Sequence, residues 1–260
     1  PLILKGEADI EKKPNFPKNI IKKVILNSLF KQAGAFLYSY KANREFFKFY
    51  GAPEEKLFFC PSAVDNDFWR SRRKKLQTKK PLFLYVGQFI PRKRLIDILE
   101  AAKILKGKID FEILFVGEGK EKDNLIKFVS ENRLSNVSFT GFKNQTELPE
   151  IYSAASIFVL PSEYDPSPKA MQEALNFELP IIVSDGVKTA PDLILNGGCG
   201  FVYEAGNIRQ LTNNIEKLIT DDKLRSKLGK NALDVASKWS PEENVKGIMS
   251  AVRYVINGRK

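Results

Sequence analysis

The chain has 260 residues, of which 43% are hydrophobic, enough for one large or two small globular domains. It contains no histidine, which excludes a Ser-His-Asp triad, a Cys-His pair and a histidine-ligated metal within this sequence. Any general acid or base must therefore be Asp, Glu, Lys, Tyr or Cys.

The net charge of +11 lies almost entirely in the first third of the chain. Residues 1–80 carry 18 Lys and Arg against 8 Asp and Glu, whereas residues 81–260 carry 24 against 23. A basic surface fits an anionic partner such as a membrane leaflet, a phosphorylated acceptor or nucleic acid. A lysine-rich composition without any such partner explains the charge equally well. Nucleic-acid binding is disfavoured, because no aromatic residues interleave with the basic run at 71–80.

We expect no signal peptide or membrane span from these residues. No apolar run approaches the roughly 20 residues that span a bilayer, and the stretch 1–13 has too short an apolar run for a signal peptide. Cys60 and Cys199 make no disulfide framework, which indicates a reducing compartment. We therefore expect a cytoplasmic protein, with possible peripheral contact at the inner face of the membrane through the basic N-terminal third.

The first part of the chain predicts alternating strands and helices. Strands are expected at 1–4, 35–40 and 56–64, and helices at 18–33 and 41–51. In the helix at 18–33, five apolar residues recur at helical spacing and predict one apolar face. They are Ile20, Ile21, Val24, Ile25 and Leu29. Packing on its own domain is the favoured interpretation of this face, and contact with a membrane surface is the alternative.

A charged stretch with few apolar residues, 71–80, predicts a linker between two domains. Beyond it, apolar runs of strand length alternate with helical patterns, which predicts a parallel, doubly wound α/β sheet. Strands are expected at 81–87, 110–117, 136–141, 157–160, 180–184 and 200–204. Helices are expected at 92–106, 120–132, 146–154, 167–177, 189–196, 207–220, 222–237 and 241–257.

The loop 161–168 lies where such a sheet binds ligands. In open α/β sheets, ligands bind outside the carboxyl ends of the strands, where helices begin. Asp165 and Glu173 are eight residues apart, so one acid lies at the start of the helix and the other about two turns on. The two carboxylates are candidates for nucleotide binding. A surface helix with two solvated acids is the alternative.

The stretch PSEYDPSPKAMQEA at 161–174 resembles the donor-sugar site of the retaining glycosyltransferases of family 4, nucleotide-sugar transferases with the GT-B fold. Their pattern is Pro-Ser, then an acid, seven residues and Glu-Ala. Asp165 stands in place of the usual first Glu, and Glu173-Ala174 matches the second. The resemblance implies a GT-B-like α/β fold with an incomplete N-terminal Rossmann-like lobe. That lobe and the crossover would cover 1–72, since AVDNDFW at 63–69 resembles the family's crossover. A nucleotide-sugar-binding domain would cover 73–240, and a C-terminal helix at 241–260 would return to the first lobe.

The strand end at 86–94, VGQFIPRKR, resembles the family's Gly-Arg … Lys-Gly motif. Gly87 and Lys93 match, whereas Gln88 and Arg94 stand where Arg and Gly are common. The resemblance assigns Lys93 to the donor diphosphate, where helix amides would add donors. Gln88 can still form a hydrogen bond but cannot neutralise charge. Arg92 and Arg94 are expected to face solvent, and an exposed basic helix start is the alternative for the whole segment.

The turns after the next two strands are placed near the nucleotide by the resemblance. They contribute Gly117 from VGEG, and Gly141 and Phe142 from FTGF. Backbone contacts from 141–143 are favoured over stacking of the Phe142 ring on the base.

The central loop supplies the remaining expected donor contacts. Pro166 and Pro168 lack N–H groups, so the donors that remain are the amides of Ser167, Lys169 and Ala170 and the Ser167 hydroxyl. The resemblance assigns Asp165 to the sugar hydroxyls and Glu173 to the ribose hydroxyls. The segment 184–193 is expected to support this site structurally rather than to contact the donor.

The resemblance implies a retaining hexosyltransferase of polysaccharide biosynthesis, with a UDP- or GDP-sugar as donor and a glycan or lipid-linked acceptor. Asp165 and Lys93 are the expected catalytic residues. Lys93 and helix amides would stabilise the leaving diphosphate, so no cofactor and no metal are expected. Rivals are a nucleotide-sugar epimerase or a glycogen-synthase-like polymerase of the same fold, and a non-catalytic or split-chain nucleotide-sugar-binding subunit. Because only part of a GT-B N-terminal domain is present, we expect a fragment or a missing domain supplied by another chain.

Overall fold

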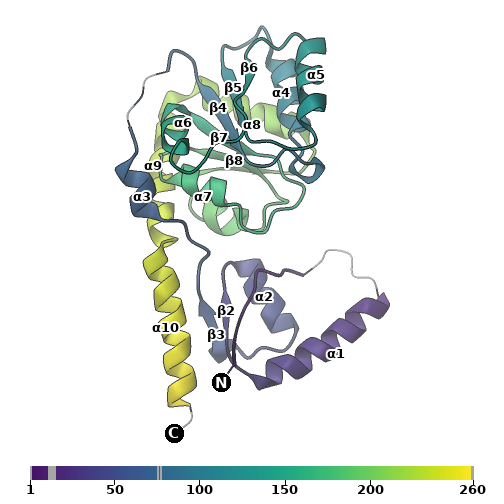
Figure 1. Cartoon of the computed structure of the whole chain (residues 1–260), viewed down its shortest axis with the longest axis vertical. Helices are drawn as coiled ribbons and strands as arrows, with labels where there is room; N and C mark the ends of the chain where they lie inside the picture. Colours follow the sequence, from purple (N-terminus) through teal and green to yellow (C-terminus); the bar gives the residue numbers. More distant parts are fainter. Residues whose placement is uncertain (1, 11–15, 75, 77, 259–260) are drawn as a thin grey trace. The chain divides into compact units, whose positions relative to one another are not determined.

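The computed structural model describes residues 2–10, 16–74, 76 and 78–258, and Figure 1 shows the chain. Pro1, and positions 75 and 77 of the predicted linker, lie outside the described residues. The chain divides into two compact units, residues 1–64 with 238–260 and residues 65–237. The sequence placed the boundary after residue 72. It lies earlier because Trp69 is buried in the second unit, where its ring packs edge-on against Tyr152 and Phe177.

The first unit contains a parallel sheet in the order β1-β2-β3. Its strands are β1 (Leu2–Lys5), β2 (Ala33–Tyr38) and β3 (Leu57–Phe59). Its helices are α1 (Phe16–Gln32), α2 (Lys41–Phe49), the 3-10 turn η1 (Glu54–Lys56) and α10 (Pro241–Asn257). The strand predicted over 56–64 is reduced to three residues, because Pro61 has no N–H with which to continue the ladder.

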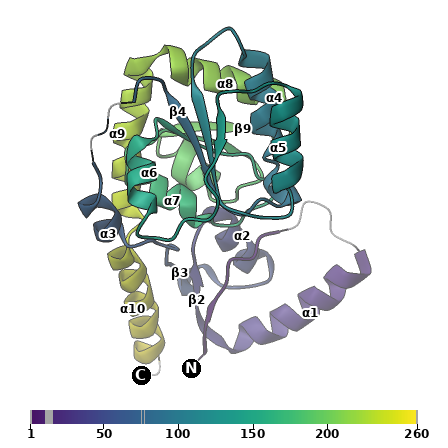
Figure 2. The ribbon, with the colours of Figure 1, turned by 45° about the horizontal axis from the view of Figure 1, so that its top comes forward.

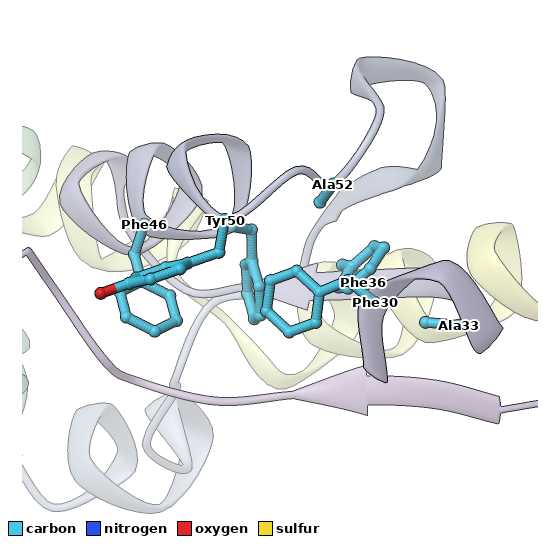
Figure 3. Packing of buried hydrophobic residues seen from close by; sticks show 7 residues of the cluster. Phe30, Ala33, Phe36, Phe46, Tyr50 and Ala52 are labelled. Carbon is cyan, nitrogen blue, oxygen red and sulfur yellow. The ribbon is translucent and has the colours of Figure 1, made fainter. Parts of the chain in front are cut away.

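Alternate residues of β2 face opposite sides of the sheet, and each side has its own core. On one side Phe36 packs in a cluster with Phe30 of α1, Phe46 of α2 and Tyr50, the residue that follows α2 (Figure 3). The ring centroids of Phe30 and Phe36 are 4.8 Å apart. Aromatic side chains of this size bury much of the apolar surface that stabilises so small a sheet.

The other side of the sheet is covered by α10. Ala35 and Leu37 of β2 pack there with Ala251 and Val255. Ser240 caps the helix by accepting a hydrogen bond from the amide of Glu243. The helix predicted over 241–257 therefore has the expected bounds.

Helix α1 packs differently from the prediction. Leu26 and Phe30 contact the core, while the four described residues of the predicted packing face are 61, 66, 60 and 38% exposed. These are Ile21, Val24, Ile25 and Leu29. The side chain of Ile20 lies outside the described part of the structure. Apolar residues thus occupy two faces of α1, and the face expected to pack is the exposed one.

The second unit is a six-stranded, wholly parallel sheet in the order β6-β5-β4-β7-β8-β9. The strands are β4 (Leu82–Val86), β5 (Glu112–Val116), β6 (Val137–Phe139), β7 (Ile157–Leu160), β8 (Ile181–Ser184) and β9 (Gly200–Tyr203). All six were predicted from apolar runs. The strand order reverses between β4 and β7, where open α/β sheets form their binding crevice.

Helices cover both sides of this sheet. Figure 2 shows α4 (Ile96–Leu105), α5 (Lys122–Glu131) and α8 (Ile208–Thr220) on one side. On the other side are α6 (Leu148–Ala154), α7 (Lys169–Leu175) and α9 (Asp222–Lys238). The remaining helices are α3 (Asn66–Ser71), the 3-10 turn η2 (Pro91–Lys93) and the π-helical turn η3 (Pro191–Leu195). The helix predicted over 92–106 begins late, because Arg94 has a φ of 50° and separates η2 from α4.

No helix in the described ranges is both long enough and apolar enough to span a bilayer.

Candidate active site

The loops that follow β4, β5 and β6 are joined to one another through their backbones. Three bonds connect them: Gly87 N to Val116 O at 3.0 Å, Phe89 N to Glu118 O at 2.8 Å, and Gly117 N to Gly141 O at 2.8 Å. The carboxyl ends of three adjacent strands therefore form one fixed frame.

Two glycines in this frame are required by close approach. A Cβ at Gly117 would lie 1.9 Å from the carbonyl oxygen of Gly87, and a Cβ at Gly119 would lie 2.3 Å from that of Phe89. Both glycines also have φ angles, 138° and 156°, that other residues rarely adopt. The VGEG turn, which is a weak motif in sequence, thus has a structural reason for each of its glycines.

A pocket of about 410 Å³ opens at this frame. Four of the predicted donor-binding residues line it, namely Gly87, Gln88, Gly117 and Phe142. The Phe142 ring is 75% exposed, so it is free to stack on a flat ligand and does not pack in the core. Gly141 joins the frame through its carbonyl oxygen.

Lys93 and Asp165 form an ion pair, although 72 residues separate them in the sequence. Their side chains are only 12% and 11% exposed. The loop after β4 therefore contributes to two places, with Gly87 and Gln88 at the pocket and Lys93 at the buried ion pair.

The segment 184–193 supports Asp165 from the other side. The Asp165 amide donates to the Gly186 carbonyl at 3.1 Å, and the Lys188 amide donates to the Asp165 carbonyl at 2.9 Å. Arg92 supports the same loop, since its guanidinium donates to the Tyr164 carbonyl at 2.9 Å. The backbone around Asp165 is thus held from both neighbouring loops.

Arg94 faces solvent only in part, since 33% of its side chain is exposed and its guanidinium pairs with a buried carboxylate. Its guanidinium donates to both carboxylate oxygens of Asp97, at 2.8 and 3.0 Å, and the Asp97 side chain is 2% exposed. This hydrogen bonding raises the pKa of Arg94. Arg94 also has a left-handed backbone at the position where the resembled motif commonly has glycine. Arg92 is exposed, as expected.

Glu173 is held by a residue that the sequence did not single out. The Tyr152 hydroxyl donates to Oε2 of Glu173 at 2.8 Å and lies 3.3 Å from the Ala170 carbonyl oxygen. Burial raises the pKa of Tyr152 well above its usual value, so the hydroxyl stays protonated. Burial also raises the pKa of Glu173, against the opposing effects of the Tyr152 hydrogen bond and the charge of Lys169.

The other predicted loop residues lie at the start of α7. The Ser167 hydroxyl accepts a hydrogen bond from Nε2 of Gln172 at 3.2 Å, which leaves its own proton available to donate. Lys169 is exposed and Ala170 is half-buried. Among the described residues, no three Asp, Glu or Cys side chains gather in a way that could hold a metal ion.

These positions lie at the carboxyl ends of parallel strands, where the sheet has its switch point. A sequence profile described as "Glycosyl transferases group 1" matches residues 67–235, well over half of the chain. The chain belongs to the group 1 glycosyltransferases. The matched range includes every residue of the candidate site.

Two curated relatives illustrate the similarity. An uncharacterized glycosyltransferase of Methanocaldococcus jannaschii is 29% identical over 165 residues, which is 64% of this chain and 46% of that protein. The N,N'-diacetylbacillosaminyl-diphospho-undecaprenol alpha-1,3-N-acetylgalactosaminyltransferase of Campylobacter jejuni is 27% identical over 249 residues, 88% of this chain and 63% of the relative. The chain thus spans less than two thirds of the length of either relative.

The fold is shared with solved glycosyltransferases of the GT-B type. HepE of Anabaena, crystallised in complex with UDP, superposes with a TM-score of 0.81 at 20% identity. The superposition covers 97% of this chain and 72% of HepE. The predicted GT-B-like α/β architecture with parallel Rossmann-like sheets is therefore confirmed.

Proposed function

We propose that this group 1 glycosyltransferase is a retaining family 4 enzyme that transfers a hexosyl group from a nucleoside-diphosphate sugar to a glycan or lipid-linked acceptor. The names of two similar proteins support the two substrates. HepE was crystallised with UDP, and the Campylobacter relative is named for a diphospho-undecaprenol acceptor. A donor of the UDP or GDP type is the corresponding proposal for this chain.

The observation that carries the proposal is the buried Lys93–Asp165 ion pair in the loop that also lines the pocket. A desolvated lysine with one anionic partner can exchange it for another without becoming an unpaired buried charge. A diphosphate bound at Lys93 would release an oxygen of Asp165 to accept a sugar hydroxyl. The ion pair thus keeps both groups compensated until the donor arrives.

Roles for the other residues follow from their positions. The pocket between the first three strand ends takes the nucleoside, with the Phe142 ring and the fixed backbone against the base. Glu173, oriented by Tyr152, accepts the ribose hydroxyls. Lys93 stabilises the charge that develops on the departing diphosphate, and preorganised charge of this kind is the main source of such catalysis. Transfer then requires no divalent ion, and excess chelator should leave the rate unchanged.

Calorimetric titration with UDP and with GDP tests the donor site. Glu173→Gln should weaken nucleotide binding at least about ten-fold, because a charged acceptor of hydroxyl donors is worth roughly 1.5–3 kcal/mol. Glu216→Gln, on the exposed surface of α8, is the matched control and should bind as the parent does. Equal affinities of parent and Glu173→Gln would refute the assignment.

The stereochemistry of transfer tests the remaining part of the proposal. The anomeric configuration of the first product, read by proton NMR, should equal that of the donor. Inversion would refute retention. Nucleotide binding with no transfer to any glycan or lipid-linked acceptor would favour the alternative of a non-catalytic nucleotide-sugar-binding subunit.

A further inference from the structure

We propose that the exposed face of α1 docks on an anionic lipid bilayer. This surface, the α1 stripe, consists of Ile21, Val24, Ile25 and Leu29. It belongs to the first unit, and the inference does not rest on the donor site of the second.

The α1 stripe is continuous and uncovered by the described residues. Its four side chains are 61, 66, 60 and 38% exposed, in chain order. At 100° per residue they span about 140° of the helix circumference. Leu26 and Phe30 on the opposite face fix the helix in the core of the unit. The helix can therefore present the stripe outward without leaving its own fold.

The charge of α1 selects the kind of partner. The helix contains four lysines and no acidic residue between 16 and 32. By helical spacing, Lys22 and Lys31 border the stripe on its two sides. Lys31 is exposed and can reach a lipid headgroup, whereas the Lys22 ammonium lies over the Phe46 ring, 5.4 Å from its centroid, and would have to leave it. Lysines beside an apolar stripe can extend their stems and place their charges among lipid headgroups.

Helix α10 supplies the contrast within the same unit. It also exposes apolar side chains, Val245, Ile248, Met249 and Ile256. The helix has no net charge, because Glu242 and Glu243 balance Lys246 and Arg253. An apolar face without net charge does not distinguish lipid from polypeptide, whereas the uniformly basic α1 is complementary to an anionic leaflet. Charge therefore favours lipid at α1 and gives no such preference at α10.

Vesicle flotation with the full chain tests the proposal. The probes are vesicles of phosphatidylcholine alone and of phosphatidylcholine mixed with phosphatidylglycerol. The parent should float with the anionic vesicles, should stay with the soluble fraction when phosphatidylglycerol is absent, and should detach at high salt because the attraction is screened.

Substitutions distinguish binding through the α1 stripe from nonspecific apolar adsorption. The triple variant Ile21→Gln, Val24→Gln, Ile25→Gln should lose binding about ten-fold or more, since three aliphatic side chains no longer enter the apolar layer. Lys31→Gln should lose about five-fold, which corresponds to about 1 kcal/mol per basic residue at the surface. The matched control Val245→Gln, Met249→Gln, Ile256→Gln on α10 should bind as the parent does. Melting temperatures confirm that each variant is folded.

Four outcomes would overturn the proposal. The first is that the parent fails to bind anionic vesicles. The second is that the α1 and α10 variants lose binding equally, which would mean nonspecific apolar adsorption. The third is that the α1 variant keeps its vesicle binding. The fourth is that the parent ignores lipid and sediments as a dimer, which the α1 variant converts to a monomer. A dimer of that kind would identify the stripe as a contact between two copies of the chain.

Discussion

The Tyr152→Phe substitution removes one hydroxyl and leaves the surrounding packing in place. The Tyr152 ring is fully buried, where it stacks on Phe177 at 5.2 Å and meets Trp69 edge-on at 5.7 Å. Phenylalanine fills the same volume. What disappears is the 2.8 Å hydrogen bond to the Glu173 carboxylate.

The loss should appear as weaker, more pH-sensitive nucleotide binding. A hydrogen bond to a charged group contributes about 1.5–3 kcal/mol, so UDP or GDP affinity should fall roughly ten-fold or more at neutral pH. The hydrogen bond from Tyr152 lowers the pKa of Glu173 against the raising effect of burial. Without it the pKa of Glu173 rises further, and the pH at which acid abolishes nucleotide binding moves upward. A role limited to packing would not move that midpoint.

Calorimetric titration across the acid range measures both effects. Tyr203→Phe is the matched control, because the Tyr203 hydroxyl is buried and has no hydrogen-bond partner within the described part of the chain. It should leave the affinity and its pH midpoint unchanged. If Tyr152→Phe binds nucleotide with the affinity and pH profile of the parent, the positioning role of Tyr152 is refuted.

Three further predictions concern stability. Lys93→Met should lower the free energy of unfolding of the second unit by about 3 kcal/mol, because it leaves the Asp165 carboxylate buried without its cation. The double variant with Asp165→Leu should recover most of that loss, as measured by urea unfolding. Equal stabilities of the single and double variants would contradict the coupling between the two residues. Gly117→Ala should lower the free energy of unfolding by more than about 2 kcal/mol, because its Cβ would lie 1.9 Å from the carbonyl oxygen of Gly87. Gly107→Ala would place no atom within 4 Å of its Cβ, so chemical denaturation should show a loss of only about 1 kcal/mol. Burial raises the pKa of Glu173, so its contribution to folding is most favourable when it is protonated and falls as pH rises above the usual carboxyl pKa. Glu173→Gln should therefore gain stability over the parent as pH rises above that usual value, and a constant difference would argue against the raised pKa.

The strands of the second unit could be predicted because they are buried on both faces. β7 and β8 are buried at all four of their residues, so each appears in sequence as an unbroken apolar run between turn residues. The sequence could not locate the domain boundary as well. The boundary depends on where the Trp69 ring packs, and a charged linker begins only after that residue.

The sequence predicted which loops form the candidate site but not which side chains contact one another there. The spacing of Asp165 and Glu173 identified the loop and helix, but the pairing of Asp165 with Lys93 joins residues 72 positions apart and has no local signature. Tyr152 did leave a signal, since a tyrosine on the buried face of a helix requires a partner for its hydroxyl. The pairing of Arg94 with the buried Asp97, three residues on, was not predicted.

Helix α1 shows where periodicity alone is ambiguous. Its apolar residues recur on two faces, and helical spacing does not say which face the sheet will take. The Phe30 ring packs in the aromatic cluster with Phe36 and Phe47, so the face of α1 that carries Phe30 is the buried one.

Backbone hydrogen bonds among the three loops after β4, β5 and β6 fix the shape of the pocket independently of the side chains that line it. Carbonyl and amide groups hold the frame, so under the proposed function a base would meet a surface that is already ordered, and little freedom would be lost on association. Phe142 and Lys143 stand on this scaffold without supporting it. If the proposed function holds, exchanging these two side chains would alter the preference for one nucleobase over another while the backbone frame stays intact.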